Sequence, residues 1–190
     1  MVSELISVKP FEWAHWVPFC RLGLAHLAEH GILLDPEAIE PPRPVPEQID
    51  KSEHEWDLEY LDVSYLRGAG GVWLAWDGEK PVGHVGAQDL GGTDVCVGVE
   101  LRRMYVRAEY RRRGIGTRLV QTLIEHCAAK GARAIELWTA RDGLGRLLYD
   151  GLGFVRTDQP GPEYEGVEAE TGYRPGLDEI RMRLDLKTQG

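Results

Sequence analysis

The sequence contains little cysteine, no long apolar run and no overall excess of positive charge. Its three cysteines lie far apart, and none forms a Cys-x-x-Cys pair or has a histidine at metal-ligand spacing. We therefore expect neither a disulfide framework nor a bound metal. No segment approaches the roughly 20 apolar residues that cross a bilayer, and the N-terminus lacks the pattern of a signal peptide. These absences predict a cytoplasmic protein.

The formal net charge is -9, so the surface as a whole repels nucleic acid and anionic membranes. We expect neither as a partner. An anion site must then be a local exception to the overall charge. The segment 102–118 is such an exception, because seven of the 22 Lys and Arg residues fall within it.

The length of 190 residues and the hydrophobic content of 43% fit a single domain over residues 1–190 with a buried core. Apolar periodicity predicts helices over 11–30, from 47 onward, over 114–131 and over 143–154. Strands are predicted over 5–10, 71–90 as a hairpin, 95–106, 132–140 and 178–186. We expect the tryptophans of the first helix to pack in the core. This order predicts an α/β fold of the α+β type, a mixed sheet with helices packed on it.

The stretch "YRRRGIGTRL", residues 110–119, connects a predicted strand to a predicted helix. A helix N-terminus exposes unpaired N–H groups, and glycines there let an anion approach the backbone closely. Arginines add charge-assisted hydrogen bonds to phosphate oxygens. The stretch therefore predicts a phosphate or pyrophosphate site. A solvated run of charge is the alternative, but it does not explain the glycines. Neither the P-loop nor the dinucleotide-binding pattern fits, because Leu119 stands where the latter needs its third glycine.

The surrounding pattern resembles the GCN5-related N-acetyltransferase (GNAT) superfamily. The acetyl-CoA motif of that family is Arg or Gln, two residues, Gly, one residue, and Gly or Ala, and residues 111–116 read RRRGIG. The strand "ELRRMYV" and the later "LLYDGLGF" follow in the family's order. The resemblance covers residues 70–156 well and the first 66 poorly. Ala108, Asp142 and Gly145 depart from residues that many members have.

The resemblance implies a GNAT-like acyl-CoA N-acyltransferase fold, with a mostly antiparallel sheet, helices on both faces and a splayed central strand pair, 98–106 and 134–140. It implies acetyl-CoA as the donor co-substrate. The pantetheine arm would run along Met104, Tyr105 and Val106, and Asp142 would be a further cofactor-binding residue. The backbone amides that would bind the pyrophosphate belong to Arg111, Arg112, Arg113, Gly114, Ile115, Gly116 and Thr117.

Acetyl transfer to an amine needs a base, a donor to the carbonyl oxygen and an acid for the thiolate. The resemblance implies Glu100 as the base, the Met104 backbone N–H as the donor and Tyr149 as the acid. Glu100, Arg102, Met104 and Val106 share one strand face if no bulge intervenes. The alternatives are a surface Glu100 paired with an arginine and a Tyr149 that only packs a helix on the sheet.

We therefore expect an acetyl-CoA-dependent N-acetyltransferase that transfers acetyl directly to a primary amine, since no cysteine falls within these motifs. Residues 47–62 and 158–170 are rich in acids, which favours a small cationic amine as the acceptor. A peptide or neutral acceptor is the alternative, for which Trp56, Tyr60 and Tyr164 would matter more. The competing class is a non-catalytic acyl-CoA-binding or regulatory module. His84 either lines the acceptor side or packs as a core histidine. The sequence does not choose between a monomer and a homodimer.

Overall fold

A computed structural model of the chain describes residues 6–29, 31, 35, 39, 60–90, 98–157 and 179–186. These residues form a seven-stranded sheet in the order β1-β2-β3-β4-β5-β7-β6. The strands are β1 Ser7–Pro10, β2 Gly71–Asp77, β3 Lys80–Asp89, β4 Gly98–Val106, β5 Ala134–Ala140, β6 Val155–Thr157 and β7 Glu179–Asp185. The helices are α1 Trp16–Glu29, α3 Leu61–Ser64, α4 Ile115–Ala129 and α5 Leu144–Gly151, with 3-10 turns η1 Trp13–His15 and η2 Ala108–Tyr110.

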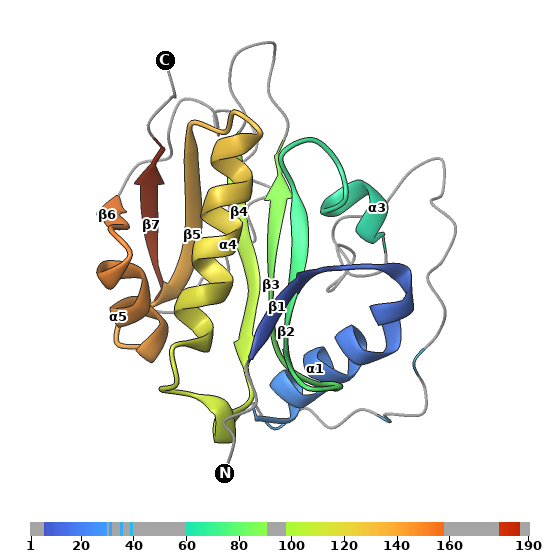
Figure 1. The fold of residues 1–190 in the computed structure, drawn as a ribbon. Coiled ribbons are helices and arrows are strands. Elements are labelled where there is room, and N and C mark those ends of the chain that lie inside the picture. Colours follow the sequence, from blue (N-terminus) through green and yellow to red (C-terminus); the bar gives the residue numbers. More distant parts are fainter. Residues whose placement is uncertain are drawn as a thin grey trace.

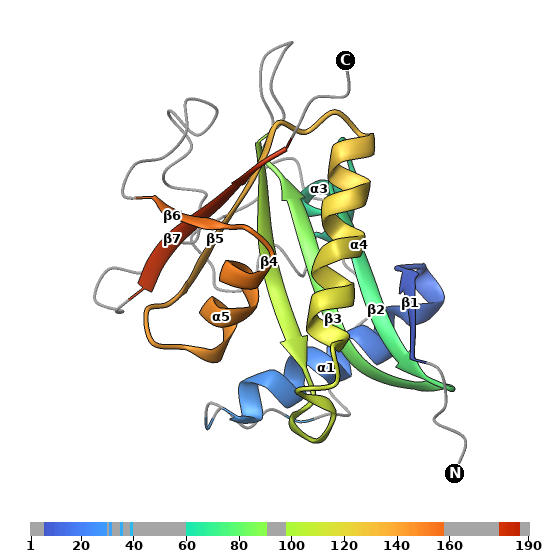
Figure 2. The same ribbon diagram turned by 60° about the vertical axis from the view of Figure 1, so that its left-hand side comes forward.

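Helices cover both faces of the sheet, as Figures 1 and 2 show. Leu123 of α4 and Tyr149 of α5 belong to one buried apolar cluster, on what we call the α4 face. Phe19 of α1 and Leu61 of α3 belong to a second cluster, on the α1 face. The β4–β5 pair is parallel, and the other strand pairs of the described sheet are antiparallel. The predicted mixed sheet is confirmed.

Several local predictions match the structure. The β2–β3 hairpin turns through Gly78 and Glu79, one residue later than the predicted Asp77 and Gly78, and Gly78 has a φ of 59°. Helix α4 buries the predicted stripe, which consists of Ile115, Leu119, Leu123 and Cys127. The chain reverses after α4 at Gly131, which has a φ of 81°. A left-handed conformation of this kind favours glycine, which explains why the helix ends there.

The first helix differs from its prediction. It begins as the turn η1 and becomes α-helical only at Trp16. Trp13 is 44% exposed, so the expectation that the tryptophans of this helix lie in the core is wrong for this residue. Trp13 instead contacts Phe11 and Trp16 at the surface. Of the helix predicted from residue 47, the part before Tyr60 lies outside the described residues.

Strand β4 contains the feature that shapes the site. Val85 of β3 lies opposite two residues of β4, Arg103 and Met104, and the register shifts there. Such a β-bulge bends its strand and re-aims the side chains that follow. Arg103 accordingly has a φ of 53°, a conformation that costs a non-glycine residue about 1–2 kcal/mol.

The bulge corrects the expectation that four β4 side chains share one face. Arg102 pairs with Gly86, where an added Cβ would meet Tyr65 of the α1-face cluster. Glu100, two residues earlier, lies on that same face. Met104 and Val106 instead pack in the α4-face cluster. The extra residue thus shifts the alternation of side chains by one position, so Met104 and Val106 lie on the face opposite to that of Glu100 and Arg102.

Strands β4 and β5 pair only from Gly98 with Ala134 to Glu100 with Glu136. Beyond these residues both strands continue without pairing to each other and diverge, which Figure 2 shows. The predicted splayed strand pair is confirmed. Within the described part of the chain, no helix is long and apolar enough to cross a membrane.

Candidate active site

The loop from β4 to α4 has the geometry expected of an anion site. Gly114, the N-cap of α4, has a φ of 74°, and no side chain of the described residues caps the helix. The N–H of Arg118 donates to the Gly114 carbonyl at 3.0 Å. The amides of the first turn therefore have no intrahelical partner, and the positive end of the helix dipole adds to their attraction for an anion.

Arg111 is engaged differently from the rest of this loop. Its backbone N–H donates to Ala108 at 3.2 Å, and its Nε donates to the Val106 carbonyl at 2.8 Å. Its Nη2 forms an ion pair with Glu29 at the end of α1. Arg111 thus fastens α1 to the loop, and the amides that remain at the helix start are those of residues 112–117.

Glu29 also accepts a hydrogen bond from the Tyr105 hydroxyl at 2.8 Å. Burial acts to raise the pKa of Glu29, but the hydrogen bonds from Arg111 and Tyr105 outweigh it, and the pKa is lowered. Burial and the bond to Glu29 raise the pKa of Tyr105 to about 12. Sequence reasoning missed Glu29, because 76 and 82 positions separate it from its partners.

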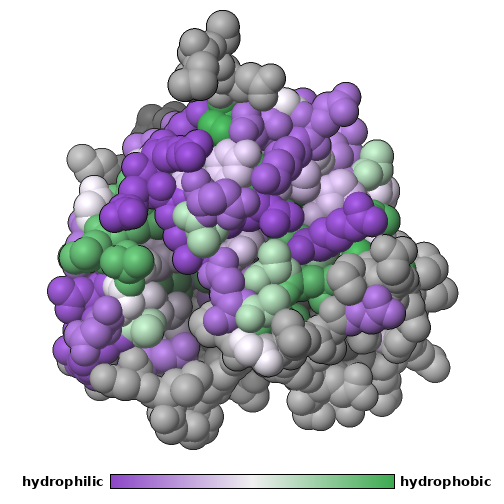
Figure 3. All heavy atoms as spheres, turned by 90° about the horizontal axis from the view of Figure 1, so that it is seen from below, coloured by the Kyte–Doolittle hydropathy of each residue, from purple (hydrophilic) through white to green (hydrophobic). Residues whose placement is uncertain are grey.

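Gly116 lies where β4, α4 and α5 meet. A Cβ added to it would lie 3.1 Å from Met104 Cε and 3.3 Å from Leu148 Cδ2. The backbone of α4 can therefore approach these side chains closely only because residue 116 is glycine. Seen from below, much of the surface is hydrophilic, with one apolar patch right of centre and another at the left, on the side of α5 (Figure 3). There, Leu144 and Leu147 are 79% and 64% exposed.

Tyr149 lies on α5 in the α4-face cluster, only 5% exposed, with its ring 5.7 Å from that of Phe154. Burial raises its pKa above the usual range of a phenol. The group therefore stays protonated at neutral pH, as a general acid must, although a higher pKa makes proton release harder. Both of its predicted roles, acid and packing residue, are compatible with this position.

Glu100 is buried, at 3% exposure, and is not the surface residue of the alternative interpretation. Its Oε1 lies 3.9 Å from Arg102 Nε. It forms the last β4–β5 pair with Glu136, which is also buried.

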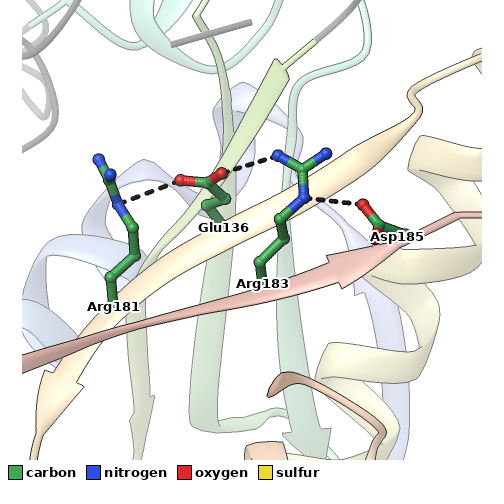
Figure 4. Close-up of polar contacts among 4 residues, drawn as sticks. All are labelled: Glu136, Arg181, Arg183 and Asp185. Carbon is green, nitrogen blue, oxygen red and sulfur yellow. Dashed lines mark hydrogen bonds and ion pairs between the residues drawn. The ribbon is translucent and has the colours of Figure 1, made fainter. Parts of the chain in front are cut away.

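The carboxylate of Glu136 lies between Arg181 and Arg183 at 3.1 and 2.9 Å, as Figure 4 shows. Sequence reasoning did not find this cluster, because β7 follows β5 by some 40 positions.

Asp142 lies at the end of β5 and lines a pocket of about 380 Å³ beside α5. The other lining residues are Arg141, Arg146, Asp150, Arg156, Ile180 and Met182. No residue of the segment 111–117 lines this pocket. Among the described residues, no three His, Cys, Asp or Glu side chains are placed to hold a metal ion.

Comparisons with known proteins agree with this architecture. The model of the acetyltransferase (GNAT) family matches residues 27–154. Human N-acetyltransferase 8 is 32% identical over 106 residues, which are 54% of this chain and 47% of that protein. The chain spans about half the length of the curated relatives it matches.

Two solved structures show the same fold. A GNAT-family acetyltransferase from Staphylococcus aureus has a TM-score of 0.68 at 20% identity and covers 96% of this chain and all of that one. A putative acetyltransferase from Salmonella typhimurium, solved with acetyl-CoA, has a TM-score of 0.62 at 16% identity and covers 96% of this chain and 94% of that one. The chain belongs to the acetyltransferase (GNAT) family.

Proposed function

We propose that this chain is a single-domain N-acetyltransferase that uses acetyl-CoA and transfers the acetyl group directly to a primary amine. The observation that carries the proposal is that β4 and β5 stop pairing after Glu100 and Glu136, next to the β4 bulge. The uncapped first turn of α4 follows β4 in the chain. Together these features form a splayed strand pair with an anion site at one end.

The residues present fit an acyl-CoA molecule. Residues 112–117 would hold the pyrophosphate through backbone amides, and Met104, Tyr105 and Val106 would border the pantetheine arm. The packing of Gly116 against Met104 and Leu148 supports this assignment, since it joins the loop to the splayed strand. Acetyl-CoA, when bound, supplies the acetyl group as a thioester. We propose that Arg111 holds α1 against the loop through its ion pair with Glu29 and that its charge lies close to the bound phosphates.

In the proposed reaction, an N–C bond forms to the acetyl carbon and the C–S bond breaks. Glu100 removes the proton of the amine, and Met104 donates its backbone N–H to the carbonyl oxygen. Tyr149 gives its hydroxyl proton to the departing sulfur. Glu100 lies four residues from Met104, roughly 13 Å along the strand, so we propose that Glu100 acts through water.

We further propose that the acceptor is a small cationic amine that enters from the α1 face. The acidic segments that motivate this choice, 47–62 and 158–170, lie outside the described residues except for 60–62, as do Trp56 and Tyr164. The described part of the α1 face carries arginines as well as carboxylates near Glu100. The preference for a cation therefore rests on the sequence.

Two measurements test the proposal. Calorimetric titration should show that both acetyl-CoA and CoA bind, and absence of binding at millimolar ligand would contradict a donor site. The kcat/KM for cationic amines should exceed that for neutral amines and should fall with added salt, since screening weakens long-range attraction. A best acceptor that is neutral or anionic, with no salt dependence, would overturn the choice of acceptor alone.

A further inference from the structure

Glu29 occupies a position that its own helix does not favour. It is the last residue of α1, where a carboxylate meets the negative end of the helix dipole. Its contacts lie outside the helix. Oε1 accepts the hydrogen bond of the Tyr105 hydroxyl at 2.8 Å, and Oε2 forms the ion pair with Nη2 of Arg111. Both carboxylate oxygens are therefore engaged with the segment that leads from β4 to α4.

The partners of Glu29 are held in turn by further contacts. The Tyr105 ring stacks on that of His26 at 4.9 Å, and the Arg111 guanidinium lies 5.7 Å from the centre of the Tyr105 ring. Arg111 Nε donates to the Val106 carbonyl at 2.8 Å. An exposed ion pair alone contributes little to stability. Here the planar guanidinium is bound by different acceptors at Nε and Nη2, which fixes its orientation.

The residue after Arg111 has a backbone conformation that needs support. Arg112 has a φ of 60°, and Gly114 has a φ of 74°. A left-handed conformation is strained for a residue other than glycine, and it persists only where the surroundings hold it. Turns of this kind gather successive backbone N–H groups into a concave nest for anions. The fixed side chain of Arg111 is directly next to this strained residue.

We infer that Glu29 is a positioning residue for the donor: its carboxylate holds Arg111, and Arg111 so held keeps the loop in the turn that presents its amides to the CoA pyrophosphate. The inference rests on the proposed function, which places the pyrophosphate at this loop. Glu29 by its charge alone repels a phosphate. Removal of the charge would therefore strengthen CoA binding if charge alone mattered, whereas loss of positioning weakens it.

The test is the Glu29→Gln variant, which keeps the size of the side chain and an oxygen acceptor for Tyr105 but has no charge for Arg111. Calorimetric titration should show that the Kd for CoA rises by about tenfold, within the range of coupling between residues in contact. The KM for acetyl-CoA should rise with it, while kcat at saturating acetyl-CoA should change little.

Glu109→Gln is the matched control. Glu109 lies in η2 of the same loop, where it pairs with Lys80 at 3.5 Å and its side chain is 58% exposed. The variant removes the same charge from the loop and leaves the contacts of Arg111 in place. Its affinity for CoA should equal that of the parent or exceed it.

A double-mutant cycle shows whether Glu29 acts through Arg111. In an Arg111→Gln protein, the further change Glu29→Gln should no longer weaken CoA binding. CoA affinity in a folded Glu29→Gln protein that equals or exceeds the parent's would overturn the inference. An equal loss with and without Arg111 would also overturn it.

Crystal structures of the parent and of Glu29→Gln provide a readout that does not depend on activity. We expect Arg111 Nε to leave the Val106 carbonyl and the φ of Arg112 to change, and an unchanged loop would overturn the inference. A parent that binds CoA and shows these effects but acetylates no amine would refute the proposed function alone. A parent that binds no CoA would overturn both.

Discussion

The proposed role of Tyr149 as general acid depends on its hydroxyl oxygen, so removal of that one atom tests it. Tyr149→Phe removes the hydroxyl and keeps the ring that packs against Phe154. We expect kcat to fall by about 100-fold or more, because a general acid acts in the transition state, while the affinity for acetyl-CoA stays close to the parent's. Steady-state kinetics and calorimetry measure the two quantities.

Tyr110→Phe is the control for this prediction. The Tyr110 hydroxyl donates to Asp77 at the end of β2 at 2.8 Å, and its loss should leave turnover unchanged. If Tyr149→Phe also leaves turnover unchanged, Tyr149 is only a packing residue.

Glu100 can be tested against its neighbour Glu136. Glu100→Gln should lower turnover and flatten the acidic limb of the rate profile against pH, because the variant has no carboxylate to titrate. Glu136→Gln leaves Arg181 and Arg183 without their shared carboxylate, so it should lower stability while the acidic limb remains. A Glu100→Gln profile identical in shape to the parent's would assign the base to another group.

The pKa of His84 also predicts how stability depends on pH. The folded-state pKa of about 3 lies below the ordinary 6.5. The unfolded chain therefore binds a proton first, and stability falls as the pH drops through this interval, by about 1.4 kcal/mol per pH unit. Burial of the imidazole is the main cause of the lowered pKa, and the charges of His26 and Arg103 add to it. Urea unfolding at several pH values should show a smaller acid loss for His84→Phe, and parallel curves would contradict the prediction.

At the scale of elements, α4 offers a matched pair of glycines. Gly114 and Gly131 flank the helix with φ values of 74° and 81°, and a Cβ at either position would meet nothing within 4 Å. Glutamate should therefore strain the backbone equally at both sites. Only Gly114→Glu places a negative charge where the phosphates are proposed to bind, and it should weaken CoA binding by about tenfold, or 1.4 kcal/mol.

Calorimetric titration of CoA into both variants measures this difference. Equal affinities of the folded Gly114→Glu and Gly131→Glu proteins would mean that the loop does not bind phosphate. Gly116→Glu is a poorer probe than its sequence position suggests. A side chain there must displace Met104 and Leu148, so weaker binding would not separate a lost phosphate contact from altered packing.

Elements with a strong local pattern were predictable from the sequence. The four-residue spacing from Ile115 to Cys127 predicted the buried stripe of α4, and the Asp77–Gly78 pair predicted the hairpin turn to within one residue. The bulge at Arg103 was not predictable, because its extra residue leaves no mark on the composition of β4. Its consequence is large, since it moves Met104 to the face opposite Glu100.

Contacts between distant parts of the chain were also beyond the sequence. Glu29 meets Tyr105 and Arg111 only because α1 crosses the sheet beside β4, and no local pattern marks it. Glu136 meets its two arginines only because β7 lies next to β5. The RRRGIG motif predicted an anion loop, but the structure was needed to show that Arg111 is engaged with Glu29.

On the scale of the whole molecule, the proposed roles divide between the two faces of the sheet. Met104 and Tyr149, proposed to act on the donor, belong to the α4 face, whereas Glu100 and Glu136 lie on the α1 face. The proposed direct transfer needs donor and acceptor bound together, and we propose that they meet where β4 and β5 diverge.

Acetyl transfer itself is tested most directly by incubating the purified chain with acetyl-CoA and a panel of primary amines that includes polyamines, aminoglycosides, lysine-like amines and peptides. Released thiol and acetylated amine are measured together, the second by mass spectrometry. We predict that CoA and the acetylated amine form in equal amounts, and only when both substrates and the protein are present. A protein that binds acetyl-CoA tightly but releases no CoA with any amine would contradict the account and identify the chain as a binding module.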